Sequence, residues 1–190
     1  IDRSRIQEYR SFSKALNDAF GGALFNTDVI VAIYGEADIG KTLFCLENAY
    51  HLSKDHNVLY IDTEGSVVSK ARYWHDVLRR KYDGRDIYIE IPLERHNDMN
   101  ILEAFAEYIG LGIRVEFKQA DKRSDKGKME ITINKRETES ELDQDIREGG
   151  INMIFVDSIV APVRAMITDE RQNAPAKASI ISAIMGRLEE

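Results

Sequence analysis

The sequence contains few of the residues that stabilise secreted or membrane-embedded proteins. Its single cysteine, Cys45, cannot form an internal disulfide or build a metal site alone, so a reducing, cytoplasmic setting is expected. No apolar run approaches the ~18 residues that a membrane span needs, which argues against any membrane association. Only 3 prolines occur and glycine- and serine-rich tracts are lacking, so we expect no flexible linker within the chain.

Positive charge is scarce as well. The chain has 26 Lys and Arg against 33 Asp and Glu, a net charge of -7 and an isoelectric point of about 5.2. A nucleic-acid-binding surface would therefore have to be a local basic patch. The hydrophobic fraction of 43% is that of a globular protein, and the length of 190 residues predicts one domain, 1–190. Because the first residue is Ile1 rather than Met, we expect a preceding segment to be missing.

Short apolar runs alternate with segments of helical periodicity along most of the chain. Runs rich in β-branched residues predict strands at 28–34, 58–62, 87–91 and 153–156. Predicted helices include a short one capped by Ser13 and ended by Gly21 and Gly22, followed by 42–52, 66–82, 97–109 and 176–188. This order predicts an α/β fold with a mainly parallel sheet sandwiched by helices.

Residues 112–150 break this rhythm and are expected to form an insert. Apolar and polar residues alternate over 113–117 and again over 129–133, which predicts an antiparallel β-hairpin. The segment that joins these strands is basic, with Lys118, Lys122, Arg123, Lys126 and Lys128. We expect this tip to be either a solvated loop or a contact site for DNA or a partner protein. Thr138 and Glu141 have the spacing of a capping box and predict a short acidic helix.

Eight consecutive residues match the phosphate-binding pattern G-x-x-x-x-G-K-[ST], namely Gly35, Glu36, Ala37, Asp38, Ile39, Gly40, Lys41 and Thr42. The two glycines let the backbone turn closely around a phosphate with its N–H groups pointing inward. Lys41 can reach the terminal phosphates, and the Thr42 hydroxyl can bind Mg²⁺. The pattern lies between a predicted strand and a predicted helix, which is the context that such a loop requires.

Two acidic residues follow predicted strands and complete a candidate nucleotide site. Asp157 comes directly after the apolar run 153–156, which is the Walker-B arrangement in which a carboxylate holds Mg²⁺. Glu64 follows the strand 58–62, where a carboxylate can orient or deprotonate an attacking water. Each acid could instead be a helix cap or a turn residue.

Several other residues are interpreted as structural. Cys45 and Trp74 lie on apolar helical faces and are expected in the core. The basic cluster Arg72, Arg79, Arg80, Lys81 and Arg85 is expected to be a solvated face, with a phosphate-backbone or partner contact as the alternative. The four histidines show no ligand spacing, so no zinc site is expected.

The order of these motifs resembles the RecA-like recombinases of the archaeal RadA/RadB type. SKALNDAFGG (13–22) precedes GEADIGKT (35–42), YIDTEG (60–65) and MIFVDS (153–158) follow, and Arg164 comes close behind. The similarity covers about 13–64 and 152–190. In this resemblance Glu64 matches the family's catalytic glutamate and Asp157 its Walker-B aspartate. ERQN (170–173) is similar to the family's G-R-x-N segment.

The resemblance implies a RecA-like P-loop ATPase core that binds ATP or ADP and Mg²⁺. It implies catalytic roles for Lys41 and Glu64, and Mg²⁺ binding by Thr42 and Asp157. It also implies a role in DNA recombination or repair, with weak or indirect contact to single-stranded DNA and a RecA-family recombinase as partner. The resemblance is compatible with a homo-oligomer and does not specify the oligomeric state.

Departures from the family pattern favour a paralogue that modulates strand exchange and hydrolyses ATP slowly. The family typically has no insert like 112–150, and no residues of this sequence match the family's N-terminal DNA-binding domain. The chain ends at Glu190, before the family's next strand and DNA-binding loop, so we expect the C-terminal part of the core to be missing. FSKA (12–15) matches the motif that links protomers, but it lies in the segment before the phosphate loop and is interpreted as a chance match.

Two other classes share the phosphate loop. The main alternative is a KaiC-like or motor-associated RecA-fold ATPase that switches a protein partner without a DNA role. A small-molecule or nucleoside kinase would need an arginine-bearing lid and an acceptor pocket, and the sequence offers no convincing lid.

Overall fold

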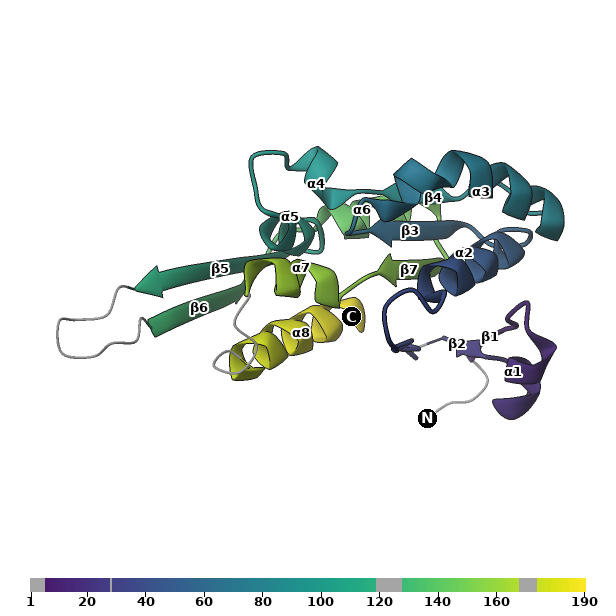
Figure 1. Ribbon diagram of the computed structural model, residues 1–190, viewed down its shortest axis with the longest axis horizontal. Helices are drawn as coiled ribbons and strands as arrows, with labels where there is room; N and C mark the ends of the chain where they lie inside the picture. Colours follow the sequence, from purple (N-terminus) through teal and green to yellow (C-terminus); the bar gives the residue numbers. More distant parts are fainter. Residues whose placement is uncertain (1–5, 28, 119–127, 168–173) are drawn as a thin grey trace. The chain divides into compact units, whose positions relative to one another are not determined.

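The computed structural model describes residues 6–27, 29–118, 128–167 and 174–190 (Figure 1). The chain packs into two compact units. Unit 1 comprises residues 1–90, 149–157 and 189, and unit 2 comprises 91–148, 158–188 and 190. Every described residue of the candidate nucleotide site belongs to unit 1. The prediction of a single domain over 1–190 stays a prediction.

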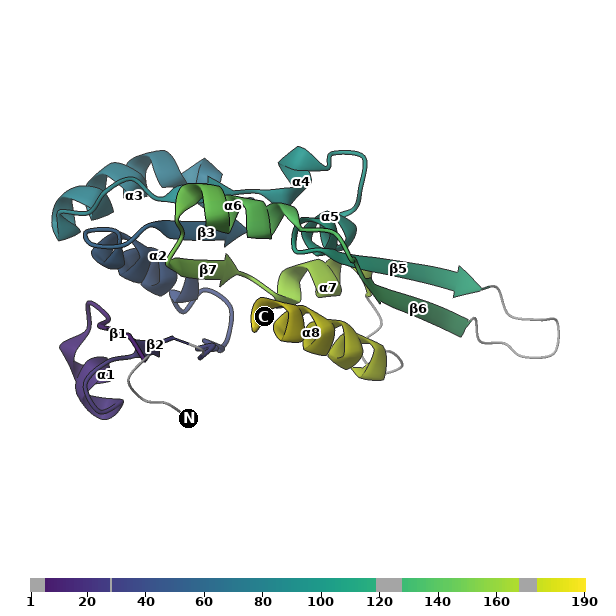
Figure 2. The same ribbon diagram turned by 180° about the vertical axis from the view of Figure 1, so that it is seen from behind.

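A three-stranded parallel sheet forms the centre of unit 1. The strands are β3 (Val58–Asp62), β4 (Tyr88–Glu90) and β7 (Met153–Asp157), in the order β4-β3-β7. The central strand β3 is buried along its whole length, as its unbroken apolar run requires. Figures 1 and 2 show β3 and β7 running side by side in the same direction. The prediction of a mixed α/β fold with a parallel sheet is confirmed.

Two helices flank this sheet, α2 (Lys41–Leu52) and α3 (Ser66–Tyr82), within one residue of the predicted bounds. The α2 helix packs against α3, β3 and β7. Leu46 and Tyr50 of α2, Val67 and Leu78 of α3, and Phe155 of β7 belong to one buried apolar cluster. Trp74 is 37% exposed, so its expected core position is wrong. Trp74 shares the predicted apolar stripe of α3 with the buried Val67 and Leu78. The indole is large, and a side chain of this size is rarely covered completely.

The N-terminal part of unit 1 has a two-stranded sheet of its own, and its Tyr9 and Phe25 belong to the same apolar cluster as α2 and β7. Strands β1 (Glu8–Tyr9) and β2 (Phe25–Asn26) pair antiparallel, and α1 (Lys14–Ala19) lies between them in the chain. Ser13 caps α1 as predicted, because its hydroxyl accepts from the Leu16 N–H at 3.4 Å.

The strand predicted at 28–34 is not formed. Residue 28 lies outside the described residues, and 29–34 have no regular secondary structure. Val29 and Tyr34 are 58% and 92% exposed. The sequence has the composition of a buried strand, but a strand also needs a partner strand. The outer edges of β4 and β7 have no partner among the described strands, yet 29–34 pair with neither, so composition alone does not make this segment a strand.

Unit 2 combines helices with a long hairpin. Its elements are α4 (Pro92–Arg95), α5 (Ile101–Tyr108), β5 (Leu111–Lys118), β6 (Lys128–Lys135), α6 (Glu141–Gly149, whose last residue belongs to unit 1), α7 (Val160–Met166) and α8 (Ala174–Leu188). The helix predicted at 97–109 begins later, because Asn100 caps it through the N–H groups of Leu102 and Glu103. Phe105, Tyr108, Ile180 and Ile184 are completely buried.

The predicted hairpin is confirmed, and its strands extend the prediction at both ends. In the antiparallel register Ile113 faces Ile133 and Val115 faces Ile131. Both β5 and β6 contact α8, and β5 also contacts α5, which leaves Ile113 6% exposed. One face of the hairpin base is therefore covered, as the alternation requires. Residues 119–127 of the basic tip lie outside the described residues.

The capping box of α6 lies two residues after the predicted pair. The Ser140 hydroxyl accepts from the Asp143 N–H at 3.1 Å, and the Asp143 carboxylate accepts from the Ser140 N–H at 3.1 Å. The same three-residue spacing is used, but Ser140 is buried whereas Thr138 is exposed. Arg187 also donates to Asp143 and thereby joins α8 to this cap. Among the described residues, no helix is long and apolar enough to cross a membrane.

Gly84 provides a test of the packing of unit 1. A Cβ at this position would overlap the Tyr50 carbonyl oxygen and lie 2.7 Å from Ser53 Oγ. Gly84→Ala should therefore lower the free energy of unfolding by about 1–3 kcal/mol. Gly186→Ala is the matched control, because its Cβ would meet nothing within 4 Å in the interior of α8. The control should raise stability by about 0.5–1 kcal/mol. Urea unfolding measures both, and equal effects would contradict this packing.

Candidate nucleotide-binding site

The phosphate-loop sequence forms an exposed turn that leads into α2. Gly40 is the residue before the helix and adopts φ +92°, a left-handed conformation that favours glycine. Asp38 also has a positive φ of 60°, which aspartate tolerates better than most residues. The α2 helix is 12 residues long, and its first N–H groups have no partner within the helix. The helix start therefore offers backbone donors at the end of this turn.

Lys41 folds back over the loop that precedes it. Its Nζ atom donates to the carbonyl oxygens of Gly35 at 3.2 Å and Glu36 at 2.5 Å. Two adjacent carbonyl groups at the start of the loop thus face this cationic group. These are exposed backbone contacts, which an anionic phosphate oxygen can replace because a charged acceptor gives the stronger hydrogen bond.

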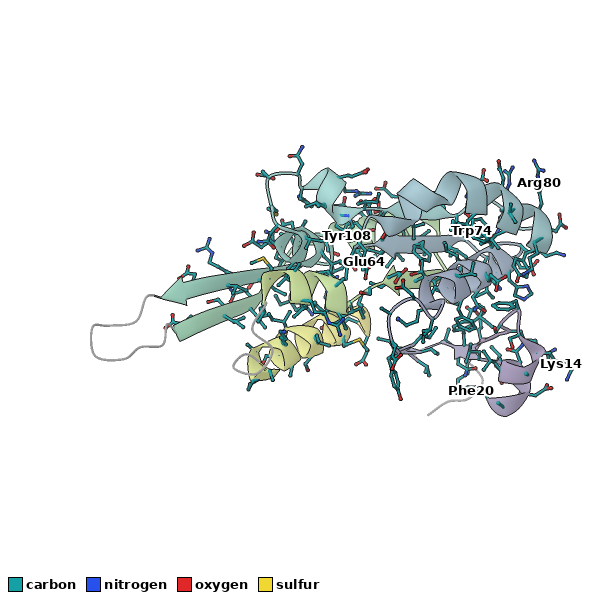
Figure 3. All side chains as sticks on the ribbon, in the orientation of Figure 1. Lys14, Phe20, Glu64, Trp74, Arg80 and Tyr108 are labelled. Carbon is teal, nitrogen blue, oxygen red and sulfur yellow. The ribbon has the colours of Figure 1, made fainter. Side chains whose placement is uncertain are left out.

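The acidic residues meet at the carboxyl edge of the sheet. Asp62 and Asp157 are paired in register as the last residues of β3 and β7. Glu64 follows two residues later, is exposed, and lies beyond the end of β3 (Figure 3). The Thr63 N–H donates to the Asp157 carbonyl oxygen at 3.0 Å and ties the two strand ends together. Ligands bind at this edge in open α/β sheets.

Asp62 is structural, a role that the sequence interpretation did not assign. It is completely buried, and its two carboxylate oxygens accept from the N–H groups of Glu64 at 3.1 Å and Val67 at 2.8 Å. These bonds shape the turn from β3 into α3. Asp62 therefore fixes the backbone that carries Glu64 and is not itself open to a ligand.

Asp157 is held by a buried tyrosine, Tyr60, which the sequence motifs do not indicate. The Tyr60 hydroxyl donates to Asp157 Oδ2 at 2.9 Å from the middle of β3. Burial and the Asp157 charge raise the pKa of Tyr60 well above its ordinary value, so the hydroxyl keeps its proton as a donor. The sequence carries no signal for this contact, because β3 is an unbroken apolar run and its register with β7 is set by the sheet.

Cys45 connects α2 to this edge. Burial and, second, the negative charge of Asp157 raise the pKa of the Cys45 thiol to about 12. Thr42 lies three positions earlier on α2 and therefore on the same side of the helix, one turn nearer to its start. The α2 helix itself contacts β7.

The donor set suits a nucleotide with Mg²⁺. A hydroxyl at position 42 and one carboxylate at position 157 are hard oxygen ligands, and Mg²⁺ takes one or two such groups together with phosphate oxygens. Across the described ranges, no group of three or more His, Cys, Asp and Glu side chains gathers to hold a metal ion by itself.

Other predicted residues lie outside this arrangement. Arg164 is exposed on α7 in unit 2, and residues 170–173 lie outside the described residues. In the basic cluster, Arg79 pairs with Asp86 at 2.9 Å and Lys81 with Glu47, whereas Arg80 is exposed near the end of α3 (Figure 3). Most of the cluster for which contacts are described thus forms ion pairs on the surface.

Comparisons with models of protein families, with curated proteins and with solved structures found no match.

The raised pKa of Cys45 predicts a protected thiol. At pH 8.5 about half of a free cysteine is thiolate, whereas a pKa of about 12 lowers that fraction on the order of 10³-fold. Alkylation by iodoacetamide in the presence of a chelator should be slower by a similar factor than in urea-unfolded protein. The raised pKa also means that stability falls as pH rises from about 8.5 toward 12. Mass spectrometry reads the single site, and comparable native and unfolded rates would contradict the assigned environment.

Proposed function

We propose that this protein binds ATP with Mg²⁺, hydrolyses it slowly, and acts in DNA recombination or repair as a RecA-like paralogue that modulates a recombinase. The observation that carries the nucleotide part is the contact of the Lys41 ammonium, at the start of α2, with two carbonyl oxygens of the preceding loop. A second support is the position of Asp157 at the carboxyl edge of the sheet, with Glu64 just beyond β3. RecA-like P-loop architecture is part of this proposal.

Binding would begin with an exchange at Lys41. The ammonium group leaves the carbonyl oxygens of Gly35 and Glu36 and pairs with the β- and γ-phosphates. The backbone N–H groups at the start of α2 donate to the same phosphates, where the helix dipole also favours negative charge. The left-handed Gly40 lets the chain pass close to the ligand without a side chain in the way.

Thr42 and Asp157 would hold Mg²⁺, which when bound neutralises charge on the phosphates. Glu64 is the residue that can take a proton from the attacking water, because it is an exposed carboxylate held beyond β3 by the Asp62 turn. The chain therefore supplies a cationic cradle on one side and acidic groups on the other. This division of charge is the one that phosphoryl transfer to water requires.

The link to DNA recombination rests on the motif resemblance rather than on the site. The proposed contact surface is the basic segment that joins β5 and β6. Its proposed partners are single-stranded DNA and a RecA-family recombinase. A KaiC-like or motor-associated ATPase would share the same site but would not respond to DNA. The response of the ATPase to DNA therefore distinguishes these two functions.

The test is ATP hydrolysis measured with and without single-stranded DNA, with Lys41→Ala as the control variant. We expect slow turnover that DNA changes, and DNA binding that weakens steeply with salt. Lys41→Ala should weaken nucleotide binding about 10–100-fold, the value of a charged hydrogen-bonded group, without a loss of folding. Unchanged affinity in this variant would refute the nucleotide site. An ATP hydrolysis rate that is the same with and without DNA at low salt would favour the protein-partner alternative.

Glu64→Gln separates binding from hydrolysis. The amide keeps the shape of the side chain but cannot accept a proton from water, so turnover should fall ~10²–10⁴-fold. Nucleotide affinity should remain at the wild-type value, because the proposed role of Glu64 is in the chemical step. Single-turnover hydrolysis and equilibrium binding measure the two quantities. Wild-type turnover in the variant would mean that Glu64 is only a cap or turn residue after β3.

A further inference from the structure

Tyr60 is a fully buried residue at the centre of β3, and its surroundings fix its ring. It is 0% exposed and belongs to the apolar cluster of unit 1. The ring stacks on Phe155 of the neighbouring strand, with centroids 6.2 Å apart and an interplanar angle of 14°. A ring packed on both the core and the adjacent strand has little freedom to turn.

The polar end of this fixed ring reaches Asp157. The Tyr60 hydroxyl donates to Asp157 Oδ2 at 2.9 Å. The Asp157 backbone is held separately, because its carbonyl oxygen accepts from the Thr63 N–H at 3.0 Å. Main chain and side chain of Asp157 are thus both tied to the β3 segment. A bond from the core to Oδ2 leaves Oδ1 as the second carboxylate oxygen for a cation.

We propose that Tyr60 is a positioning residue for the divalent cation of the site, acting through the Asp157 carboxylate. This inference rests on the proposed nucleotide function. A surface aspartate can turn about its side-chain bonds, and that freedom is lost when it binds a cation. Tyr60 removes the freedom in advance, so the carboxylate meets Mg²⁺ already oriented. Outer partners of this kind change metal affinity by about 10–100-fold when they are removed.

Tyr60→Phe tests the role, since it deletes only the hydroxyl and keeps the ring. Tyr50→Phe is the matched control, because Tyr50 is also a buried tyrosine and its hydroxyl bonds to His75 Nδ1 instead. Binding of a fluorescent ADP analogue is titrated with Mg²⁺ and, separately, measured in a chelator. We expect Tyr60→Phe to raise the half-saturating Mg²⁺ concentration about tenfold and to leave the chelator value unchanged. Tyr50→Phe should change neither.

Two further variants separate the hydroxyl from its packing. Phe155→Leu removes the stacked ring but keeps the Tyr60 hydroxyl, so it should lower the melting temperature and shift the Mg²⁺ requirement much less than Tyr60→Phe does. In an Asp157→Asn background, Tyr60→Phe should add no further loss of Mg²⁺ dependence, because both changes act through one carboxylate. If Tyr60→Phe has the same effect in both backgrounds, Tyr60 does not act through the Asp157 carboxylate.

The outcomes also distinguish this inference from the proposed function. If the wild-type protein binds ADP with the same affinity in Mg²⁺ and in chelator, the metal part of the proposed function fails. If the wild type responds to Mg²⁺ and Tyr60→Phe responds at the same concentration, only the positioning role is overturned. A shift that Phe155→Leu reproduces in full would mean that general loosening of the core is the cause.

Discussion

The parallel pairing of β3 with β7 is the constraint on which the candidate site depends. Its register sets Asp62 beside Asp157, and residues nearly one hundred positions apart in the chain are thereby brought to one sheet edge. A shift by one residue would turn every side chain of β7 to the opposite face. The Tyr60–Asp157 bond and the Thr63–Asp157 bond both require this register. The strand pairing, the core packing and the geometry of the candidate site therefore all depend on the same β3–β7 register.

The two acids at this edge have different roles because their surroundings differ. Asp62 has both oxygens bound to backbone N–H groups and is completely buried, so its charge stabilises a turn. Asp157 is only partly buried and has one oxygen held from the core. A partly buried carboxylate can be reached by a cation, whereas a completely buried one cannot. Burial and hydrogen bonding, rather than sequence position, thus distinguish the structural acid from the candidate cation ligand.

The segment before the phosphate loop is where local preference and tertiary structure disagree. Residues 29–34 have the β-branched composition of a buried strand, yet Val29 and Tyr34 are exposed and no described strand pairs with them. The loop that follows is nevertheless shaped by its own residues, through Gly40 and the return of Lys41 onto two carbonyl oxygens. Loop geometry depends on residues a few positions apart, and a strand depends on a distant partner.

Elements with local signals can be predicted from the amino-acid sequence. Periodicity predicts α2, α3, β3, β4, β7 and the β5–β6 hairpin, and motif spacing predicts the phosphate loop, Glu64 and Asp157 as candidates. Features that need contacts between distant residues emerge only in the folded molecule. The tertiary structure made Ser140 rather than Thr138 the cap of α6, exposed part of Trp74, and left 29–34 unpaired. It also joined Tyr60 to Asp157, because strand register is fixed by the packing of the whole sheet and cannot be read from either strand alone.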